Sequence, residues 1–529
     1  QYPDRSNSAG FDINDDAAVS KVLEDIKTNV YGRALNYNEI LDRKTTFEGK
    51  AEISVNPADK NDVLGHVPVS DTHDINQVVQ AAADGWSEWN GLNPENRADI
   101  LDKIADLYEE HKNILIGLCM REGGRTLHDA LLEVREAVDF CRYYAMQARQ
   151  LFEPLELPGP TGESKSLTHE GRGVFVCISP WNFPIAIFTG QIAAALVSGN
   201  SVVAKPAEQT PFTAALAVKL MYQAGVPRNV LHLVAGDGEI GAKLVNHPDI
   251  AGVCFTGSHG VAKLINKSLA DRPGPIPRLI AETGGQNAII VDSTALPEQV
   301  VDDVIHSAFY SAGQRCSAAR IVLIQEDVAD NIIHMLRGAM QTLKIGDPLD
   351  ISTDIGPVID PQALETLEEH RHTLERIGQK LAVTPMSPES KENGPFFAPC
   401  LYEIDEISQL KKEVFGPILH VIRFNAKNLD TIIQQLNETG YGLTFGVHSR
   451  IESRYEWLVE KIRAGNCYVN RSITGAVVGV QPFGGRGLSG TGPKAGGPHY
   501  LSAVVTEKSI SVNTAAIGGN ASLVGLDEE

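Results

Sequence analysis

The chain is predicted to have an α/β fold built on parallel, doubly wound sheets. From Gly173 to Gly285, short apolar runs alternate with helical segments. This alternation is typical of a parallel sheet with helices on both faces and of Rossmann-like ligand binding. A second α/β unit runs from Gln286 to Gly484. A chain of 529 residues is too long for one ordinary domain, so two or three domains are expected.

The segments that precede the first alternating unit are less regular. Residues 1–50 are polar and weakly patterned and predict a lead-in, within which Ala17–Tyr31 is a candidate helix. Ser54–Pro57 and Asp62–Ser70 have the composition of short strands joined by a turn. Asp99–Arg121 is expected to form one helix, which ends before a pair of glycines.

A longer helix is predicted to begin after Thr126, which is a good N-cap residue. Its apolar residues recur at steps of three and four, namely Leu127, Leu131, Val134, Val138, Cys141 and Ala145. A neighbouring stripe contains Leu132, Phe140 and Tyr143, so the helix is expected to pack between layers. Glu136 lies on that second stripe, and a carboxylate among apolar neighbours needs a partner. A surface position for Glu136 is the alternative.

The first alternating unit can be assigned element by element. Pro211 follows Thr210, a favourable start for a helix, and Gly225 and Pro227 end that helix. The predicted strands are Val174–Ile178, Ser201–Lys205, Val230–Val234 and Gly252–Phe255, and another helix is predicted over Ala186–Val197.

Composition excludes several classes of function. The formal net charge is −21 and no Lys/Arg-rich run occurs, which argues against nucleic-acid binding. The seven cysteines are scattered without a CxxC pair, which indicates reduced thiols in a cytoplasmic compartment and no zinc site. No run reaches the ~18 apolar residues that a membrane span needs, and no signal-peptide layout is present. Because the first residue is not Met, the chain is expected to be a fragment or a processed product.

The stretch Ser311–Ala319 is the centre of the predicted chemistry. Cys316 follows a helical segment and precedes a β-rich run, so it is expected on a short loop, next to the basic Arg315. A nucleophilic thiol needs a lowered pKa and an open path. Glu282 lies on a glycine-broken turn and is a candidate general base for activating water. Taken alone, a single cysteine is more often a small buried apolar residue.

Several separate motifs favour a catalytic role for Cys316 over that of a buried apolar residue. They are Ile178-Ser-Pro-Trp-Asn-Phe-Pro184, Lys205-Pro-Ala-Glu208, Phe255-Thr-Gly-Ser258, Glu413-Val-Phe-Gly-Pro417 and Gln481-Pro-Phe-Gly-Gly485. With Glu282 and Cys316, in this order, they resemble the aldehyde dehydrogenase superfamily over roughly residues 53–508.

The resemblance implies a division of the chain into three structural units. These are an NAD-binding domain of residues 51–150 and 173–285, a catalytic domain of residues 286–484, and a β-hairpin oligomerisation flap of residues 151–172 and 499–512. It also implies a homodimer or a higher oligomer. A plain surface hairpin is the alternative interpretation of the flap.

The resemblance also implies NAD as the cofactor and a set of residues that bind it. Gly257 and Ser258 at a helix start would face the pyrophosphate. Lys205 and Glu208 would bind the adenosine ribose, where an acidic residue disfavours the 2′-phosphate of NADP. The remaining cofactor-binding residues would be Ile178, Pro180, Trp181, Glu413 and Phe415. The glycine-rich run 236–241 matches a dinucleotide fingerprint but lacks the acidic partner expected about 20 residues later.

The implied mechanism is covalent and needs no metal. Cys316 would attack an aldehyde, while Asn182 and the Cys316 backbone N–H stabilise the oxyanion. After hydride transfer, Glu282 would activate the water that hydrolyses the thioester. A turn-forming role before Phe-Pro is the alternative for Asn182, and a solvated ion pair is the alternative for Lys205 and Glu208.

The residues around the nucleophile resemble the branch that oxidises L-glutamate γ-semialdehyde, which forms from 1-pyrroline-5-carboxylate. In that branch Ser317, Gly475 and Ala476 would bind the substrate α-carboxylate, since a backbone nest suits an anion. Phe183 and Phe483 would enclose the aliphatic chain, and Arg315 would pair with Glu136.

Further stretches, including Pro206–Thr210 and Gly490–Pro498, resemble the C-terminal half of the proline utilization A family. In that family the activity is fused to a flavin-dependent proline dehydrogenase. No flavin half is present in this sequence, so no flavin is expected. Two alternatives remain: an aldehyde dehydrogenase for another semialdehyde, such as succinate semialdehyde, and a nucleotide-binding scaffold without turnover.

Overall fold

The computed structural model describes residues 5–42 and 51–517. Parts of the predicted lead-in, residues 1–4 and 43–50, lie outside the described residues. The remainder of that segment and the residues after it form a small sheet of order β1-β3-β2 beside two helices. These elements are α1 (Asp16–Asn29), β1 (Leu35–Asn36), α2 (Tyr37–Ile40), β2 (Ala51–Asn56) and β3 (Asp59–Pro68).

A five-stranded parallel sheet of order β10-β9-β6-β7-β8 forms the middle of the molecule. Its strands are β6 (Val174–Ile178), β7 (Ser201–Lys205), β8 (Leu231–Leu233), β9 (Ile250–Gly257) and β10 (Arg278–Thr283). Ile178 is level with Lys205 on one side and with Phe255 on the other. The carboxyl ends of β6, β7 and β9 therefore meet at one edge of the sheet, where ligands bind in open α/β sheets.

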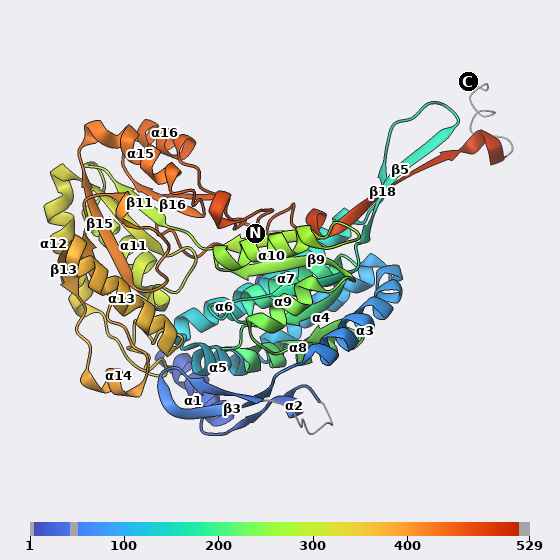
Figure 1. Cartoon of the computed structure of the whole chain (residues 1–529), viewed down its shortest axis with the longest axis horizontal. Coiled ribbons are helices and arrows are strands. Elements are labelled where there is room, and N and C mark those ends of the chain that lie inside the picture. The colour runs from blue at the N-terminus through green and yellow to red at the C-terminus, as the bar shows by residue number, and fades with distance from the viewer. Residues whose placement is uncertain (1–4, 43–50, 518–529) are drawn as a thin grey trace.

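Helices cover both faces of this sheet (Figure 1). They are α3 (Thr72–Gly91), α4 (Pro94–Glu110), α5 (Lys112–Gly123), α6 (Leu127–Leu151), α7 (Ala186–Val197), α8 (Pro211–Ala224), α9 (Gly238–Asn246) and α10 (His259–Asp271). Every residue of α7 except Ile187 is buried, and α7 packs against α6 and the sheet.

One helix boundary differs from the sequence-based expectation. The single helix expected over Asp99–Arg121 is divided at His111, where α4 ends and α5 begins. The His111 backbone is non-helical (φ −98°, ψ 15°), and its imidazole Nδ1 hydrogen-bonds with the Leu107 carbonyl oxygen at 3.0 Å. The apolar periodicity continues through the break, because both helices bury residues in the same core.

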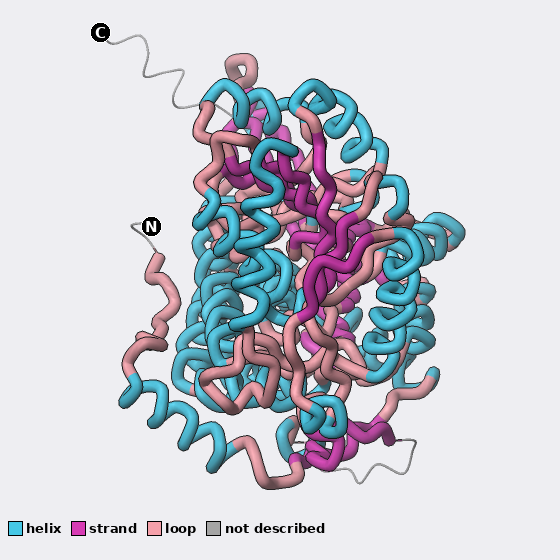
Figure 2. The backbone as a smooth tube through the Cα atoms, turned by 90° about the vertical axis from the view of Figure 1, so that its left-hand side faces the viewer, coloured by secondary structure: helices cyan, strands magenta, loops and turns pink. Residues whose placement is uncertain are grey.

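A seven-stranded sheet of order β13-β14-β15-β12-β11-β16-β17 forms the second large unit, and only β13 is antiparallel to its neighbour. Figure 2, in which the left-hand side of Figure 1 faces the viewer, shows strands in magenta with helices on either side of them. Its strands are β11 (Asn287–Val291), β12 (Ala319–Gln325), β13 (Gln379–Val383), β14 (Cys400–Glu403), β15 (Ile418–Phe424), β16 (Thr444–His448) and β17 (Asn466–Val469). The helices of this unit are α11 (Pro297–Phe309), α12 (Glu326–Thr342), α13 (Pro361–Ile377), α14 (Pro388–Asn393), α15 (Leu429–Glu438) and α16 (Glu452–Lys461).

A third sheet of order β18-β5-β4 projects away from both large units (Figure 1). Its strands are β4 (Leu155–Glu156), β5 (Glu163–Gly171) and β18 (Val505–Asn513). The pairing of β5 with β18 brings together two segments more than 300 residues apart, with Gly171 opposite Val505 and Glu163 opposite Asn513. No helix among the described residues is long and apolar enough to cross a membrane.

Candidate active site

The loop that carries Cys316 has a strained backbone. It starts with the 3-10 turn η1 (Tyr310–Gly313), in which Ser311 and Ala312 have φ values of 57° and 53°, and Gly313 follows at 63°. Such left-handed conformations cost about 1 kcal/mol or more for a residue with a side chain. They persist only where surrounding contacts fix them, so this loop depends on its neighbours.

Two residues that the sequence analysis did not select hold this loop. The Asn287 side-chain amide donates to the carbonyl oxygens of Cys316 (2.6 Å) and Ala318 (2.9 Å). The buried Arg320 guanidinium donates to the carbonyl oxygens of Gly313 (2.7 Å) and Gly416 (3.0 Å). A sequence signal existed for Arg320, because a charged residue opens an otherwise apolar strand and therefore needs partners.

Cys316 is partly exposed, and its side chain lines a cavity in the protein. Burial in the site raises the pKa of its thiol to about 12, and the carboxylates of Glu413 and Glu282 contribute to the rise. The expected activation by the adjacent basic residue is absent, because the Arg315 charge is paired elsewhere. The thiol is therefore protonated near neutral pH, and its proton must leave when it attacks a substrate.

Glu282 lies near the end of β10, and its carboxylate is turned toward a glycine-rich turn. The Gly485 backbone N–H donates to Glu282 Oε2 at 3.0 Å. Oε1 is buried and has no hydrogen-bond partner among the described residues. Burial raises the pKa of Glu282 to about 8, against the lowering effect of the Gly485 N–H. A Cβ atom at Gly484 or Gly490 would crowd this carboxylate, which explains why glycine suits both positions.

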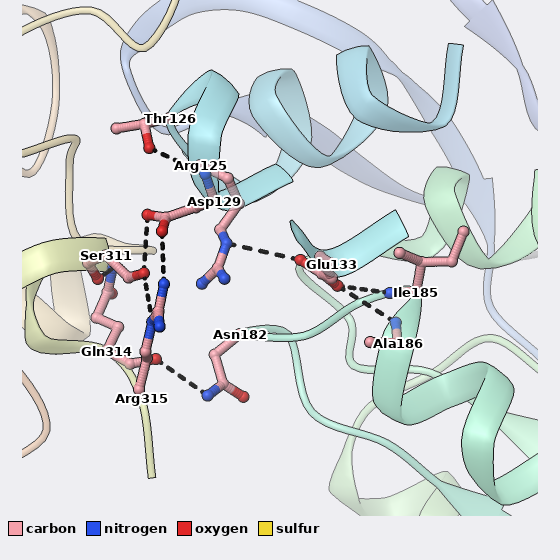
Figure 3. A network of polar contacts seen from close by, with 10 residues as sticks. All are labelled: Arg125, Thr126, Asp129, Glu133, Asn182, Ile185, Ala186, Ser311, Gln314 and Arg315. Atoms are coloured by element: carbon pink, nitrogen blue, oxygen red, sulfur yellow. Dashed lines mark hydrogen bonds and ion pairs between the residues drawn. The ribbon is translucent and has the colours of Figure 1, made fainter. Parts of the chain in front are cut away.

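Asn182 lies on the turn between β6 and α7, beside the loop that carries Cys316, which we call the nucleophile loop (Figure 3). Its side-chain amide donates to the Gln314 carbonyl oxygen at 3.0 Å, two residues before Cys316. An amide nitrogen carries two hydrogens, so one donor remains for another acceptor.

A cavity of about 260 Å³ opens beside Cys316 and Glu282. Cys316 and Glu282 line it, together with all the residues expected to bind substrate: Phe183, Arg315, Ser317, Gly475, Ala476, Phe483 and Glu136. These residues come from α6, the β6–α7 turn, β10, the loop that carries Cys316 and the segment after β17. Gly475 has a φ of 79°, a left-handed conformation that suits glycine.

The expected pairing of Arg315 with Glu136 is wrong. Arg315 Nη2 instead contacts Asp129 Oδ1 at 2.5 Å, and both side chains are buried (Figure 3). Asp129 lies on α6, one turn before Glu133. The apolar stripe predicted this helix, but it did not predict which of its carboxylates would reach the loop that carries Cys316. The Glu136 carboxylate forms neither a hydrogen bond nor an ion pair with any other described residue. Burial and the nearby Glu133 raise its pKa to about 8.

The predicted cofactor residues gather at the carboxyl edge of the five-stranded sheet. Lys205 ends β7, and its ammonium donates to the Pro206 carbonyl oxygen at 3.0 Å and lies 3.9 Å from Glu208. Gly257 ends β9, and Ser258 caps α10 by accepting from the Val261 N–H at 3.3 Å. Ile178 ends β6, and Pro180 and Trp181 follow it on the turn.

Glu413 and Phe415 lie just before β15, in the unit built on the seven-stranded sheet. Glu413 accepts from Arg320 at 3.4 Å, and a Cβ atom at Gly284 would overlap its carboxylate. Phe415 packs edge-to-face against Trp181, with ring centroids 5.6 Å apart, and lies under the Arg320 guanidinium at 5.2 Å. These contacts join the two large units next to Cys316.

The fold, the nucleophile loop and the cofactor edge together define a known class of protein. The chain belongs to the aldehyde dehydrogenase family, whose model matches residues 45–510. Enzymes of this kind use NAD or NADP.

The chain is 48% identical to the bifunctional protein PutA of Klebsiella aerogenes, over 94% of this chain and 37% of that protein. It is 36% identical to the 1-pyrroline-5-carboxylate dehydrogenase of Bacillus subtilis, over 85% of this chain and 87% of that protein. A crystal structure of a proline utilization A variant from Bradyrhizobium japonicum matches with a TM-score of 0.88 and 50% identity, over 98% of this chain and 49% of that one. The chain thus spans well under half of the length of the bifunctional relative from Klebsiella.

Proposed function

We propose that the chain oxidises L-glutamate γ-semialdehyde, formed by hydrolysis of 1-pyrroline-5-carboxylate, to L-glutamate with NAD in proline catabolism. The observation that carries this proposal is the shared cavity of Cys316, Glu282 and the residues proposed to hold an amino acid. The name of the relative from Bacillus subtilis, 1-pyrroline-5-carboxylate dehydrogenase, supports the same substrate.

The chain's own residues perform the covalent steps. The Cys316 sulfur attacks the aldehyde carbon, and the thiol proton is released to water as the C–S bond forms. Asn182, through its second amide hydrogen, and the Cys316 backbone N–H stabilise the oxygen that becomes an oxyanion. The bound dinucleotide supplies the acceptor for the hydride that leaves the tetrahedral carbon. Glu282 then takes a proton from water, which hydrolyses the thioester and releases the acid and the free thiol.

The residues at the sheet edge fit NAD better than NADP. Lys205 is buried, and its ammonium has three hydrogens. Among the described residues only the Pro206 carbonyl oxygen accepts one of them, so donors remain for ribose hydroxyls. Glu208 is partly exposed beside it and suits hydroxyl donors. A 2′-phosphate at the same place would meet the Glu208 carboxylate, and like charges repel. The N-terminus of α10 beside Gly257 and Ser258 favours the pyrophosphate.

The cavity offers a partner for each end of the substrate. Ser317 and the backbone N–H groups of Gly475 and Ala476 would hold the α-carboxylate. Phe183 and Phe483 would pack on the aliphatic chain. Arg315 forms an ion pair with Asp129, so the Glu136 carboxylate faces the cavity without it. The substrate α-ammonium would pair with this carboxylate.

An assay of the purified chain with pyrroline-5-carboxylate and NAD tests the proposal. We expect NADH formation, which Cys316→Ala abolishes without loss of NAD binding. Ser317→Ala should lower kcat/KM for this substrate roughly ten- to hundred-fold, since a hydrogen bond to a charged group is worth about 1.5–3 kcal/mol. Propanal, which lacks the carboxylate, is the matched control. Equal losses on both substrates would favour a general aldehyde or another semialdehyde.

We also infer the organisation of the chain from this function. Residues 51–150 and 173–285 form the NAD-binding domain, residues 286–484 form the catalytic domain, and residues 151–172 and 499–512 form a flap that joins subunits. The exposed apolar side chains of Ile510 and Val512 on the edge strand β18 support the flap assignment. In the full-length protein this chain would be fused to or partnered with a proline dehydrogenase. The free cysteines support a cytoplasmic location.

A further inference from the structure

A buried cluster of charged residues at the start of α6 lies between the nucleophile loop and the Asn182 turn (Figure 3). Asp129 binds the loop through both carboxylate oxygens. Oδ1 accepts from Arg315 at 2.5 Å, and Oδ2 accepts from the Ser311 hydroxyl at 2.8 Å. The Ser311 oxygen in turn accepts from Arg315 Nε at 2.8 Å. These contacts close a ring around the residue that begins the left-handed stretch.

The same cluster binds the Asn182 turn through Glu133, one helical turn further along α6. Glu133 Oε1 accepts from the backbone N–H of Ile185 at 2.8 Å and of Ala186 at 3.4 Å. These N–H groups open α7, which has no N-cap side chain of its own. Glu133 therefore fixes the point at which the turn carrying Asn182 enters its helix.

Arg125 lies close to Glu133 and to the turn that carries Asn182. Its Nε lies 3.6 Å from Glu133 Oε2, and its guanidinium lies over the Phe183 ring at 4.9 Å. Although burial alone raises the pKa of Asp129, the guanidinium groups of Arg315 and Arg125 and the Ser311 hydroxyl hold it well below its usual value. Arg125 thus lies beside Glu133 and the residue that follows Asn182, and its charge acts on Asp129 without a direct hydrogen bond or ion pair.

We propose that Asp129, Glu133 and Arg125 form one positioning unit that sets the distance and orientation between the Asn182 amide and the Cys316 sulfur. The reason is geometric. The strained Ser311–Ala312 backbone and the start of α7, which has no cap of its own, each rely on a side chain from one of two successive turns of α6. A displacement of ~1 Å between nucleophile and oxyanion donor can cost ~10²-fold in rate. The inference rests on the proposed roles of Cys316 and Asn182 but is independent of the identity of the aldehyde.

A double-mutant cycle tests this unit. Asp129→Asn and Glu133→Gln keep the side-chain shapes but remove the charges that Arg125 and Arg315 meet. The hydride-transfer rate is measured in the first turnover, with pyrroline-5-carboxylate and, separately, with propanal. We expect each single variant to lose at least about tenfold in this rate, with KM for NAD and aldehyde changed less than about threefold. The double variant should be no slower than the slower single variant, because both changes break one unit.

Asp62→Asn is the matched control. It removes the carboxylate from a comparably short ion pair, with Arg121 at 2.6 Å, on elements that do not line the cavity. It should reduce stability but leave the first-turnover rate unchanged. If the Asp129 and Glu133 variants behave like this control, or if their rate losses multiply in the double variant, the proposal is overturned.

A milder variant covers the case in which the charge removals prevent folding. Ser311→Ala deletes only the hydroxyl between Arg315 and Asp129. It should slow the first turnover about three- to tenfold with KM unchanged. Full activity in this variant would also overturn the proposal. Failure of the unsubstituted chain to oxidise pyrroline-5-carboxylate would sink the proposed function alone, since the propanal measurements would stand.

Discussion

The carboxyl group of Glu282 is kept protonated near neutral pH by burial, which raises its pKa to about 8. A general base acts in its ionised form, so thioester hydrolysis should accelerate as the pH rises through about 8 and level off above it. The hydride step should lack this dependence on Glu282. Steady-state kcat and the first-turnover rate, each measured against pH, would separate the two steps.

Glu282→Gln keeps the shape of the side chain but cannot ionise. This variant should show a burst of about one NADH per site, followed by a steady rate ~10²-fold slower that no longer rises through this pH range. If the burst and the steady rate fell together, Glu282 would act before hydride transfer rather than after it.

Glu136 tests the specificity of the same cavity. Glu136→Gln removes a carboxyl group that is proposed to ionise when the substrate α-ammonium binds beside it, and should raise KM for pyrroline-5-carboxylate about ten-fold. KM for propanal, which has no amino group, should stay within a factor of about two. An equal effect on both aldehydes would mean that Glu136 supports the cavity wall rather than recognising the amino acid.

At the scale of single elements, helix α8 begins without a capping side chain of its own. Glu122 from α5 supplies the acceptors instead, binding the N–H groups of Phe212 and Thr213 at 2.8 Å each and the Thr213 hydroxyl at 2.7 Å. Glu122→Ala would leave these buried donors unsatisfied, which costs roughly 1–3 kcal/mol for each group that finds no water. We expect a clearly lower midpoint of urea unfolding.

Glu122→Gln is the control for that change, because its amide oxygen can still accept from at least one of the donors. It should lose less stability than Glu122→Ala. Equal losses would show that filling the buried volume, and not capping of α8, is the contribution of Glu122.

At the scale of the whole molecule, most residues of the projecting sheet are not buried, so this sheet has little core of its own. Ile510 and Val512 lie on one face of the edge strand β18 and are 40% and 38% exposed. If this sheet joins subunits, Ile510→Asp with Val512→Asp should convert the oligomer to a smaller species in sedimentation velocity. Ile351→Asp, which places a charge on another exposed apolar residue, should not. An unchanged sedimentation coefficient in the double variant would count against the flap assignment.

The sequence alone determined the features that depend on local patterns. The alternating runs from Gly173 predicted the strands and helices, since burial of one face imposes a period on the chain. The motifs around Asn182, Glu282 and Cys316 predicted the chemistry, because each contains a reactive group with the turn residues that expose it. Only the tertiary structure showed that Glu282 and Cys316, from separate elements, line one cavity, and that the Asn182 amide contacts the loop that carries Cys316.

Tertiary structure also decided which charges meet. Arg315 pairs with Asp129, which is 186 residues away, and not with Glu136 on the same helix. Asn287 holds the Cys316 loop, and Glu122 and Glu133 cap helices to which they are not joined. Periodicity identifies the face on which a side chain lies, but a hydrogen bond depends on distances of a few tenths of an ångström between elements. Those distances follow from how the layers pack, which no local pattern records.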